Sequence, residues 1–217
     1  MSIRKVNFVP KEYYHIYNRG NSKQEIFHDD EDYILFIKLL HLLNRSSNIR
    51  VSELIDFGFD ISVNEPLVSI GAYVLMPNHF HILITPTETG DISKFMQKVC
   101  TTYVMYHNKK YKRTGSLFEG KFKSQYLDNN IYLKYIFSYI HLNPVKLIDK
   151  NWKINGISNK QKALDFLQKY QYSSYLDYLI PKTRSQEIIL NRAGFPDYFP
   201  NKDNFKKEIL EWLSFKE

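Results

Sequence analysis

The segment that most constrains the fold and function of this chain is residues 73–86, YVLMPNHFHILITP. It carries His79 and His81, one residue apart, within a run of apolar side chains. Successive side chains of a β-strand point to opposite faces, so both histidines would share one face while Phe80 packs on the other. The residues Met-Pro-Asn at 76–78 interrupt the apolar run and are typical of a tight connection. The segment therefore predicts a β-hairpin whose second strand begins with two imidazoles.

The paired histidines have two interpretations. Two neutral imidazoles side by side make half of a site for a divalent metal ion. They are equally well explained as ordinary polar positions of a half-exposed strand. The His-x-His spacing alone leaves both interpretations open, so the remainder of the chain has to decide between them.

The composition limits the class of protein. A length of 217 residues, 43% of them hydrophobic, suits one domain, or one domain with a small appendage. No run approaches the ~18–20 apolar residues of a membrane span, and the first residues, MSIRKVNFVP, lack the apolar core of a signal peptide. The single cysteine, Cys100, excludes an intramolecular disulfide and fits a reducing cytoplasm. A formal charge of +7 indicates a polyanionic partner.

Hydrophobic periodicity predicts a mixed α+β fold. Apolar residues recur at helical spacing in four segments, 29–45, 92–111, 130–143 and 204–215. Strand patterns occupy four others, 13–18, 68–75, 79–86 and 122–127. This order matches the ferredoxin-like split βαβ arrangement, an antiparallel sheet with helices on one face. We expect a C-terminal helical extension, with a division into residues 1–150 and 151–217.

Two details accompany this prediction. Asp91 or Ser93 is expected to cap the second helix at its N-terminus. Residues 44–66 have little periodicity and are expected to form a loop or an insertion. The part from Asn48 to Glu65 is longer than we expect between a first helix and a second strand, so its role is open.

The most basic part of the chain lies at the end of the second predicted helix, in NKKYKRTGSLFEGKFKS. Aromatic residues, among them Tyr111 and Phe118, are interleaved with its cations. Basic side chains neutralise phosphates and aromatic faces stack on unpaired bases, whereas a solvated helix end is the alternative interpretation. The residues predicted to contact nucleic acid are Arg19, Lys109, Lys110, Lys112, Arg113, Lys121 and Lys123.

The third predicted helix contains Tyr139 and Asn143, which lie one turn apart on the same face. Pro144 makes Asn143 the expected end of that helix, because the residue before proline is disfavoured in the α region. A tyrosine beside a metal-binding residue indicates nucleophilic attack on a phosphodiester whose oxygens a metal polarises. Neighbouring tyrosines such as Tyr132 and Tyr135 are candidates by the same spacing, and most of them must serve packing.

Four motifs together resemble those of the REP-associated tyrosine transposases. These are IS200-like, single-strand transposases with one catalytic tyrosine, within the HUH endonuclease superfamily. In chain order the motifs are YHIYNRGNSKQEIF, YVLMPNHFHILI, NKKYKRTGSLFEGKFKS and YIHLNPVK. The resemblance extends over residues 13–178 and includes QYSSYLDY, a segment that commonly closes the domain in that family. The combination is highly specific, although each motif alone is moderately so.

The resemblance implies a role for each residue of the site. His79 and His81 would be the HUH pair with Phe80 between them, Asn143 the third metal ligand and Tyr139 the nucleophile. The family uses Mg²⁺ or Mn²⁺, binds hairpins in single-stranded DNA and forms a 5′-phosphotyrosine link with release of a 3′-OH. Such an enzyme would act in the cytoplasm, associated with the nucleoid when bound to DNA, as a monomer or a homodimer.

Two rival functions remain compatible with the sequence. The same ligands would serve a metal-dependent nuclease that activates water, and a domesticated relative would bind hairpins without cutting them. A relaxase or replication initiator is disfavoured, because such proteins usually carry Tyr-x-x-Lys. Here the residue three positions after Tyr139 is Leu142, and the one three positions after Tyr135 is Ser138.

Overall fold

The fold is built on an antiparallel sheet. The computed structural model describes residues 7–50, 52, 56 and 58–214. Within this part of the chain, four strands pair in the order β2-β3-β1-β4. They are β1 (Tyr13–Arg19), β2 (Val68–Met76), β3 (His79–Pro86) and β4 (Lys123–Leu127). All neighbouring strands are antiparallel. The order is that of the ferredoxin-like fold, and the predicted fold class is confirmed.

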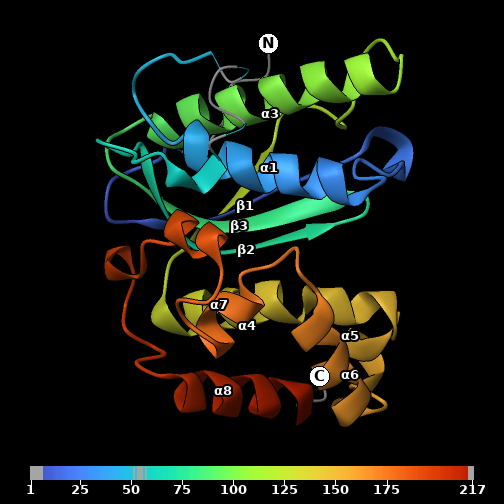
Figure 1. The fold of residues 1–217 in the computed structure, drawn as a ribbon. Coiled ribbons are helices and arrows are strands. Elements are labelled where there is room, and N and C mark those ends of the chain that lie inside the picture. Colours follow the sequence, from blue (N-terminus) through green and yellow to red (C-terminus); the bar gives the residue numbers. More distant parts are fainter. Residues whose placement is uncertain (1–6, 51, 53–55, 57, 215–217) are drawn as a thin grey trace.

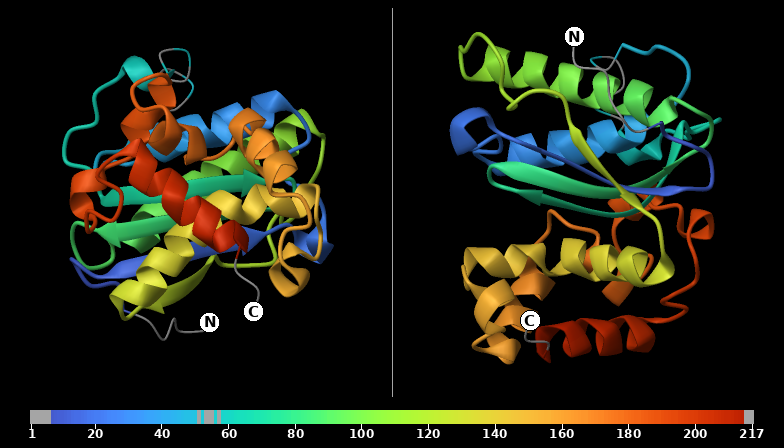
Figure 2. Two further views of the ribbon diagram at one scale, coloured as in Figure 1. Left: turned by 90° about the horizontal axis from the view of Figure 1, so that it is seen from below. Right: turned by 180° about the vertical axis from the view of Figure 1, so that it is seen from behind.

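Helices cover both faces of the sheet rather than the one face that was expected, because α4 packs on the face opposite α1 and α3 (Figure 1). The two crossover helices, α1 (Asp30–Leu42) and α3 (Asp91–Lys110), lie on one face. The opposite face carries the C-terminal half of the chain (Figure 2). Its helices are α4 (Asn130–Leu142), α5 (Trp152–Asn155), α6 (Lys160–Lys169), α7 (Tyr175–Leu179) and α8 (Lys202–Ser214).

The alternation of β3 separates two hydrophobic cores. Phe80, Ile82 and Ile84 are fully buried in the core beneath α1 and α3. Leu83 belongs to the second core, which the sheet shares with α4 and the C-terminal helices. Because His81 and Leu83 are two residues apart, they share a face, and the histidine pair consequently points toward α4.

The helices begin at capping residues that the sequence offers. The Asp29 and Asn129 side chains accept the backbone N–H groups of Asp32 and Tyr132, which caps α1 and α4. The predicted cap of α3 by Asp91 or Ser93 is wrong. Its N-cap is Gly90, in the left-handed region at φ 94°, a conformation that costs glycine little because it has no Cβ.

The QYSSYLDY segment extends the sheet beyond β2. Leu75 N–H donates to the Tyr172 carbonyl, and Ser174 N–H donates to the Tyr73 carbonyl. The Ser174 hydroxyl lies 2.8 Å from His141 Nε2 in α4. This segment therefore ties α4 to the central hairpin. The division of the chain at residue 150 stays a prediction.

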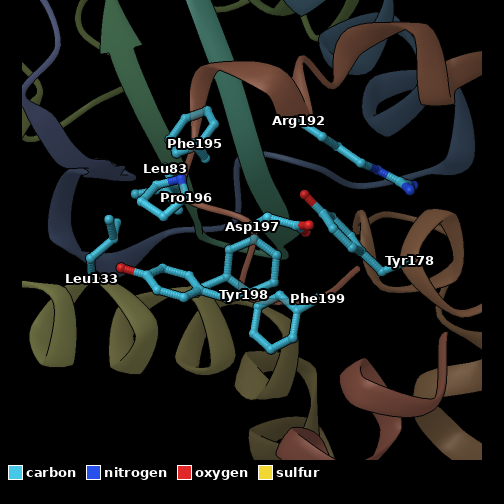
Figure 3. A pocket seen from close by; sticks show the side chains of 10 residues that line it. Leu83, Leu133, Tyr178, Arg192, Phe195, Pro196, Asp197, Tyr198 and Phe199 are labelled. Carbon is cyan, nitrogen blue, oxygen red and sulfur yellow. The ribbon is translucent and has the colours of Figure 1, made fainter. Parts of the chain in front are cut away.

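The chain then crosses the sheet edge before it enters α8. Residues 195–199 line a cavity of about 40 Å³ against Leu83 of β3 and Leu133 of α4 (Figure 3). Gly71 of β2 permits this approach, because a Cβ there would lie 2.9 Å from the Phe195 ring. The small cavity is a packing defect of the second core rather than a binding site.

The expected loop between α1 and β2 contains one turn of 3-10 helix, Gly58–Asp60. His41 of α1 forms a hydrogen bond with the Ile61 carbonyl at 2.7 Å, which holds the loop against the helix. Residues 51, 53–55 and 57 lie outside the described residues. Among the helices of the described part of the chain, none has the length and apolar character to cross a membrane.

Candidate active site

The first two site residues lie where β3 begins. A two-residue turn at Pro77 and Asn78 ends β2, and His79 opens the next strand. His79 Nδ1 lies 2.6 Å from Asn78 Oδ1. An amide oxygen only accepts hydrogen bonds, so His79 Nδ1 donates and its Nε2 keeps a lone pair. Such a partner fixes the orientation of a metal-binding imidazole.

His81 is oriented by a histidine that the sequence reasoning did not single out. His15 of β1 places Nε2 2.8 Å from His81 Nδ1, and the two rings are stacked with centroids 4.9 Å apart. When His81 Nδ1 donates this hydrogen bond, His81 Nε2 is left with its lone pair. The His-x-His spacing identified His79 and His81 in the sequence. His15 lies 66 positions before His81 and comes next to it only because β1 pairs with β3.

The three imidazoles are held in their neutral form. Burial lowers the pKa of His15 to about 4, and the nearby positive charge of Lys153 adds to the effect. Burial, followed by the charge of Lys146, also lowers the pKa of His79 to about 4. The pKa of His81 lies well below its ordinary value, chiefly because the ring is buried. Near neutral pH all three rings therefore have a lone pair to offer.

The other two site residues come from α4 and the 3-10 turn that follows it. The Tyr139 ring lies 5.4 Å from the His81 ring between centroids. The α-helix ends at Leu142 and Asn143 opens the 3-10 helix Asn143–Leu147, with only 2% of the residue exposed. The backbone angles of Asn143, φ −54° and ψ −38°, nevertheless lie in the α region, so the expectation that Pro144 would exclude this conformation is wrong. Burial raises the pKa of the Tyr139 hydroxyl, and hydrogen bonding with Asn143 opposes that rise. Asn143 also acts on the pKa of His79, so it lies between the tyrosine and the histidine pair.

A basic cleft opens over these residues. It has a volume of about 450 Å³ and is lined by Tyr17, Asn18, Arg19, Lys23, Asn78, His79, His81, Lys123, Tyr139 and Lys146. The Nζ of Lys153, in α5, lies 3.7 Å above the centroid of the Tyr139 ring. The cleft thus brings a tyrosine hydroxyl, two imidazoles and several cations to one place.

The donor set fits a divalent metal ion. Asn143 Oδ1 is buried and has no hydrogen-bond partner among the described residues. A buried amide oxygen without a partner is costly unless a ligand satisfies it. Divalent cations such as Mg²⁺ and Mn²⁺ take oxygen donors, among them amide carbonyls, and neutral imidazole nitrogens are ligands of transition-metal ions. In the described part of the chain, no group of three His, Cys, Asp or Glu side chains forms an alternative metal site.

The basic segment divides into paired and exposed cations. Lys110 Nζ contacts carboxylates of Asp29, Glu31 and Asp32 at 2.8–2.9 Å, which ties the end of α3 to the start of α1. Arg113 donates to the Gln24 amide oxygen. Sequence reasoning grouped both residues with the DNA-contacting set, because it does not show which acidic residues lie opposite.

The remaining predicted cations lie at the surface. Lys109, Lys112, Lys121 and Lys123 are exposed, and Lys123 also lines the cleft. Arg19 lines the cleft as well, with its guanidinium paired to both carboxylate oxygens of Glu119. The exposed cations therefore extend from the end of α3 to the rim of the cleft.

Comparison with known proteins finds one family model that matches part of the chain. Residues 59–143 match the family model described as "Transposase IS200 like". This match begins before β2 and ends at Asn143, so it includes His79, His81 and Tyr139. No curated protein sequence matches the chain.

Two solved structures match the chain to different degrees. One is a REP-associated tyrosine transposase bound to a REP hairpin, with 13% identity and a TM-score of 0.52, covering 82% of this chain and 85% of that one. The other is tRNA(His) guanylyltransferase from Saccharomyces cerevisiae, with 12% identity and a TM-score of 0.37, covering 91% of this chain and 87% of that one. The family model confirms the likeness to IS200-like transposases, and the first structure confirms the fold.

Proposed function

Because residues 59–143 carry the sequence of an IS200-like transposase, we propose that this protein is a metal-dependent transposase of single-stranded DNA. In this proposal it recognises DNA hairpins and cuts and rejoins strands through a 5′-phosphotyrosine intermediate. The likeness to a transposase that binds a REP hairpin supports the choice of partner. The observation that carries the proposal is the buried Asn143 Oδ1, which lacks a partner among the described residues although the Asn143 side chain acts on the pKa of both His79 and Tyr139.

In this proposal, His79 and His81 each offer Nε2 and Asn143 offers Oδ1 to one Mg²⁺ or Mn²⁺ ion. The bound ion supplies a positive charge that polarises the oxygens of the scissile phosphate. Asn78 and His15 orient the two imidazoles through the hydrogen bonds at their Nδ1 atoms. These two orienting residues, one in the turn before β3 and one in β1, explain how the two imidazoles of β3 would keep a fixed geometry.

Tyr139 is the proposed nucleophile. Its Oη attacks the phosphorus atom, a new Oη–P bond forms, and the bond between phosphorus and the departing O3′ breaks. The phenolic proton is lost and the departing oxygen is released as a 3′-OH, so charge and atoms balance. Attack by a second 3′-OH on the phosphotyrosine reverses these steps and joins a new strand. The Lys153 ammonium lies above the Tyr139 ring and adds positive charge beside the attacking group.

Exposed cations hold the DNA in this proposal. Lys109, Lys112, Lys121 and Lys123 supply phosphate contacts on the path to the cleft. Lys110 is left out of this set, because its three carboxylate neighbours already neutralise its charge. Arg113 and Arg19 would contact DNA only by exchanging Gln24 and Glu119 for phosphate oxygens.

The nucleophile separates this function from its rivals. Labelled single-stranded hairpin DNA is incubated with the protein and Mn²⁺ and run on a denaturing gel. The wild type should give a covalent protein–DNA band. Tyr139→Phe removes one oxygen and keeps the ring, so it should bind DNA, form no adduct and cut nothing. Tyr132→Phe and Tyr135→Phe, on the same helix, serve as matched controls and should remain active.

Other outcomes would favour the rival functions. Free cut DNA without an adduct, unaffected by Tyr139→Phe, would indicate a nuclease that activates water. A complex on a native gel without cleavage, for the wild type with Mn²⁺, would indicate a hairpin-binding protein that has lost its chemistry. Either result would overturn the tyrosine mechanism.

A further inference from the structure

Three tyrosines of α4 form a row that leads to the cleft. Tyr132, Tyr135 and Tyr139 recur at helical spacing, and consecutive rings have centroids 6.1 and 6.2 Å apart. Both pairs of rings are within 12° of parallel. All three side chains are half-buried, whereas the opposite side of α4 is fully buried in the second core. The rings therefore lie along the margin of the helix rather than within the core.

The row runs beside the edge strand of the sheet. β4 pairs only with β1 in this sheet order, and α4 follows directly from it and packs against it. Lys123 and Gln125 of β4 are exposed and pair with Tyr17 and His15 of β1. Paired residues share one face of a sheet, and His15 contacts the Tyr139 ring, with centroids 6.2 Å apart. Lys123 and Gln125 consequently lie on the face that carries the tyrosine row.

Packing explains only part of this arrangement. Tyr135 contacts the Trp212 ring of α8 at 5.0 Å between centroids, and Lys134 pairs with Glu208 of the same helix. These contacts hold the row in place from the α8 side. These contacts do not require three near-parallel aromatic rings, because leucine side chains at the same positions would make an equally good apolar contact between the two helices. Parallel half-exposed rings next to cations are the arrangement that binds unpaired bases.

We propose that Tyr132 and Tyr135 form a stacking track for unpaired bases of the strand that enters the cleft and reaches Tyr139, whose ring has the Lys153 ammonium over one face. The track rests on the proposed function, because it ends at the residue that attacks the DNA. Lys123 at the cleft rim and Lys153 above Tyr139 supply the positive charge that the phosphates of such a strand need. Aromatic faces stack on any base, so the track would hold the strand without reading its sequence.

Binding without cleavage tests the track. Fluorescein-labelled oligothymidylate is titrated by anisotropy into the Tyr139→Phe protein without metal, so no cutting occurs. Tyr132→Leu with Tyr135→Leu, in that background, should weaken binding about tenfold, because base–aromatic stacking is lost. Tyr132→Phe with Tyr135→Phe should bind within about twofold of the parent, because phenylalanine keeps the aromatic face. The dependence of the affinity on salt should be unchanged in both, because the phosphate contacts remain.

The matched control is Tyr126→Leu. Tyr126 is a similarly exposed tyrosine on β4, but it pairs with Tyr14 and lies on the opposite face of the sheet. Its replacement should leave the affinity for oligothymidylate unchanged. Equal affinity of the leucine and phenylalanine pairs would overturn the track.

A measurement on the unaltered protein covers the case in which the leucine pair fails to fold. Oligonucleotides carrying 2-aminopurine at each position in turn are bound to the wild type without metal. Stacking on a tyrosine should quench the fluorescence of at least one position, and bright fluorescence at every position would refute the track. Neither measurement depends on cleavage, so a wild type that quenches the probe but cuts nothing would overturn the proposed function and leave the track intact.

Discussion

At the scale of single residues, Asn143 has an unusual environment. Its side chain is buried at the end of α4, and its Oδ1 has no hydrogen-bond partner in the described part of the chain. An unsatisfied buried carbonyl lowers the stability of the folded state by roughly 1–3 kcal/mol. If Asn143 served only packing, an apolar residue of similar size would fill the same space without this cost. A bound group that interacts with Asn143 Oδ1, such as a metal ion that the oxygen coordinates, removes this cost.

The first prediction concerns metal affinity. Asn143→Ala, His79→Ala and His81→Ala should each weaken Mn²⁺ binding by at least about tenfold, because each removes one of three protein donors. Isothermal titration calorimetry with Mn²⁺ measures the change, and hairpin binding should survive because the exposed lysines are untouched. Asn143→Asp is the matched control and should bind Mn²⁺ at least as well as the wild type, since it keeps an oxygen donor. Unchanged Mn²⁺ affinity in a variant lacking both histidines would refute the assignment.

Sequence reasoning found those residues of the site that lie close together in the sequence. His79 and His81 share a strand, and Tyr139 and Asn143 share a helix, so spacing alone placed each pair on one face. His15 and Lys153 were missed for one physical reason: single residues on separate elements carry no spacing signal. Only the pairing of β1 with β3 brings His15 to His81, and only packing of α5 brings Lys153 above Tyr139.

At the scale of elements, the basic residues at the end of α3 have two roles. One lysine packs against α1, and others are exposed to solvent, although all of them belong to one basic run in the sequence. Lys110 binds three carboxylates at the start of α1 and joins two helices. Lys109 and Lys112, its near neighbours, point outward and are exposed. The helical period turns adjacent residues to different sides, so one part of the run packs and another part faces solvent.

The second prediction separates these roles by salt dependence. Alanine at Lys109, Lys112, Lys121 and Lys123 together should flatten the plot of log affinity against log salt for single-stranded DNA. The slope should fall by roughly 0.7 for each phosphate that the variant no longer neutralises. Anisotropy titrations between low and physiological salt measure it, and an unchanged slope would show that this surface is only solvated.

The third prediction is the complement of the second. Lys110→Met should lower the free energy of unfolding by about 1–3 kcal/mol, because fully buried Asp32 loses the ammonium that pairs with it. The salt slope of DNA binding should stay at its wild-type value. Urea denaturation and the same anisotropy titrations measure the two effects. A flattened slope with unchanged stability would place Lys110 on the DNA instead.

Most helices and strands were predictable because their periodicity agrees with their burial. The apolar stripe of α1 reflects one buried face, and the nearly continuous apolar run of β3 reflects burial on both faces. The start of α3 was not predicted correctly, because its N-cap, Gly90, depends on backbone conformation rather than on a capping side chain. The pairing of QYSSYLDY with β2 also escaped prediction, because a short segment gives no sign of its distant partner.

At the scale of the whole molecule, α4 is held between the sheet and the C-terminal helices. His141 lies fully buried at the centre of this contact, between the Ser174 hydroxyl and the rings of Phe137, Tyr178 and Phe205. It is on the same helix as Tyr139 and precedes Asn143 by two residues. The stability of this interface therefore controls whether the two helix-borne site residues meet the histidines.

The fourth prediction follows from the protonation of His141. Burial lowers its pKa from 6.5 to about 3 in the folded protein, while the unfolded chain keeps an ordinary value. Between those values the unfolded state binds a proton that the folded state does not, so stability is full above pH 6.5 and falls as the pH drops. From pH 6.5 to 4 this one residue should remove about 3 kcal/mol from the free energy of unfolding, at about 1.4 kcal/mol per pH unit.

Urea denaturation at a series of pH values across this window tests the assignment through two variants. His141→Gln has no group to protonate, so its unfolding free energy should change less with pH than that of the wild type, by about 1 kcal/mol per pH unit. The other buried histidines, among them His107 with its pKa lowered to about 4 by burial, should maintain a residual slope. Tyr178→Phe is the matched control: it removes the hydrogen bond to the Gly71 carbonyl beside His141 and should lower stability by about 1 kcal/mol equally at every pH. If His141→Gln keeps the full wild-type slope, the acid sensitivity arises elsewhere, and α4 is not held through His141.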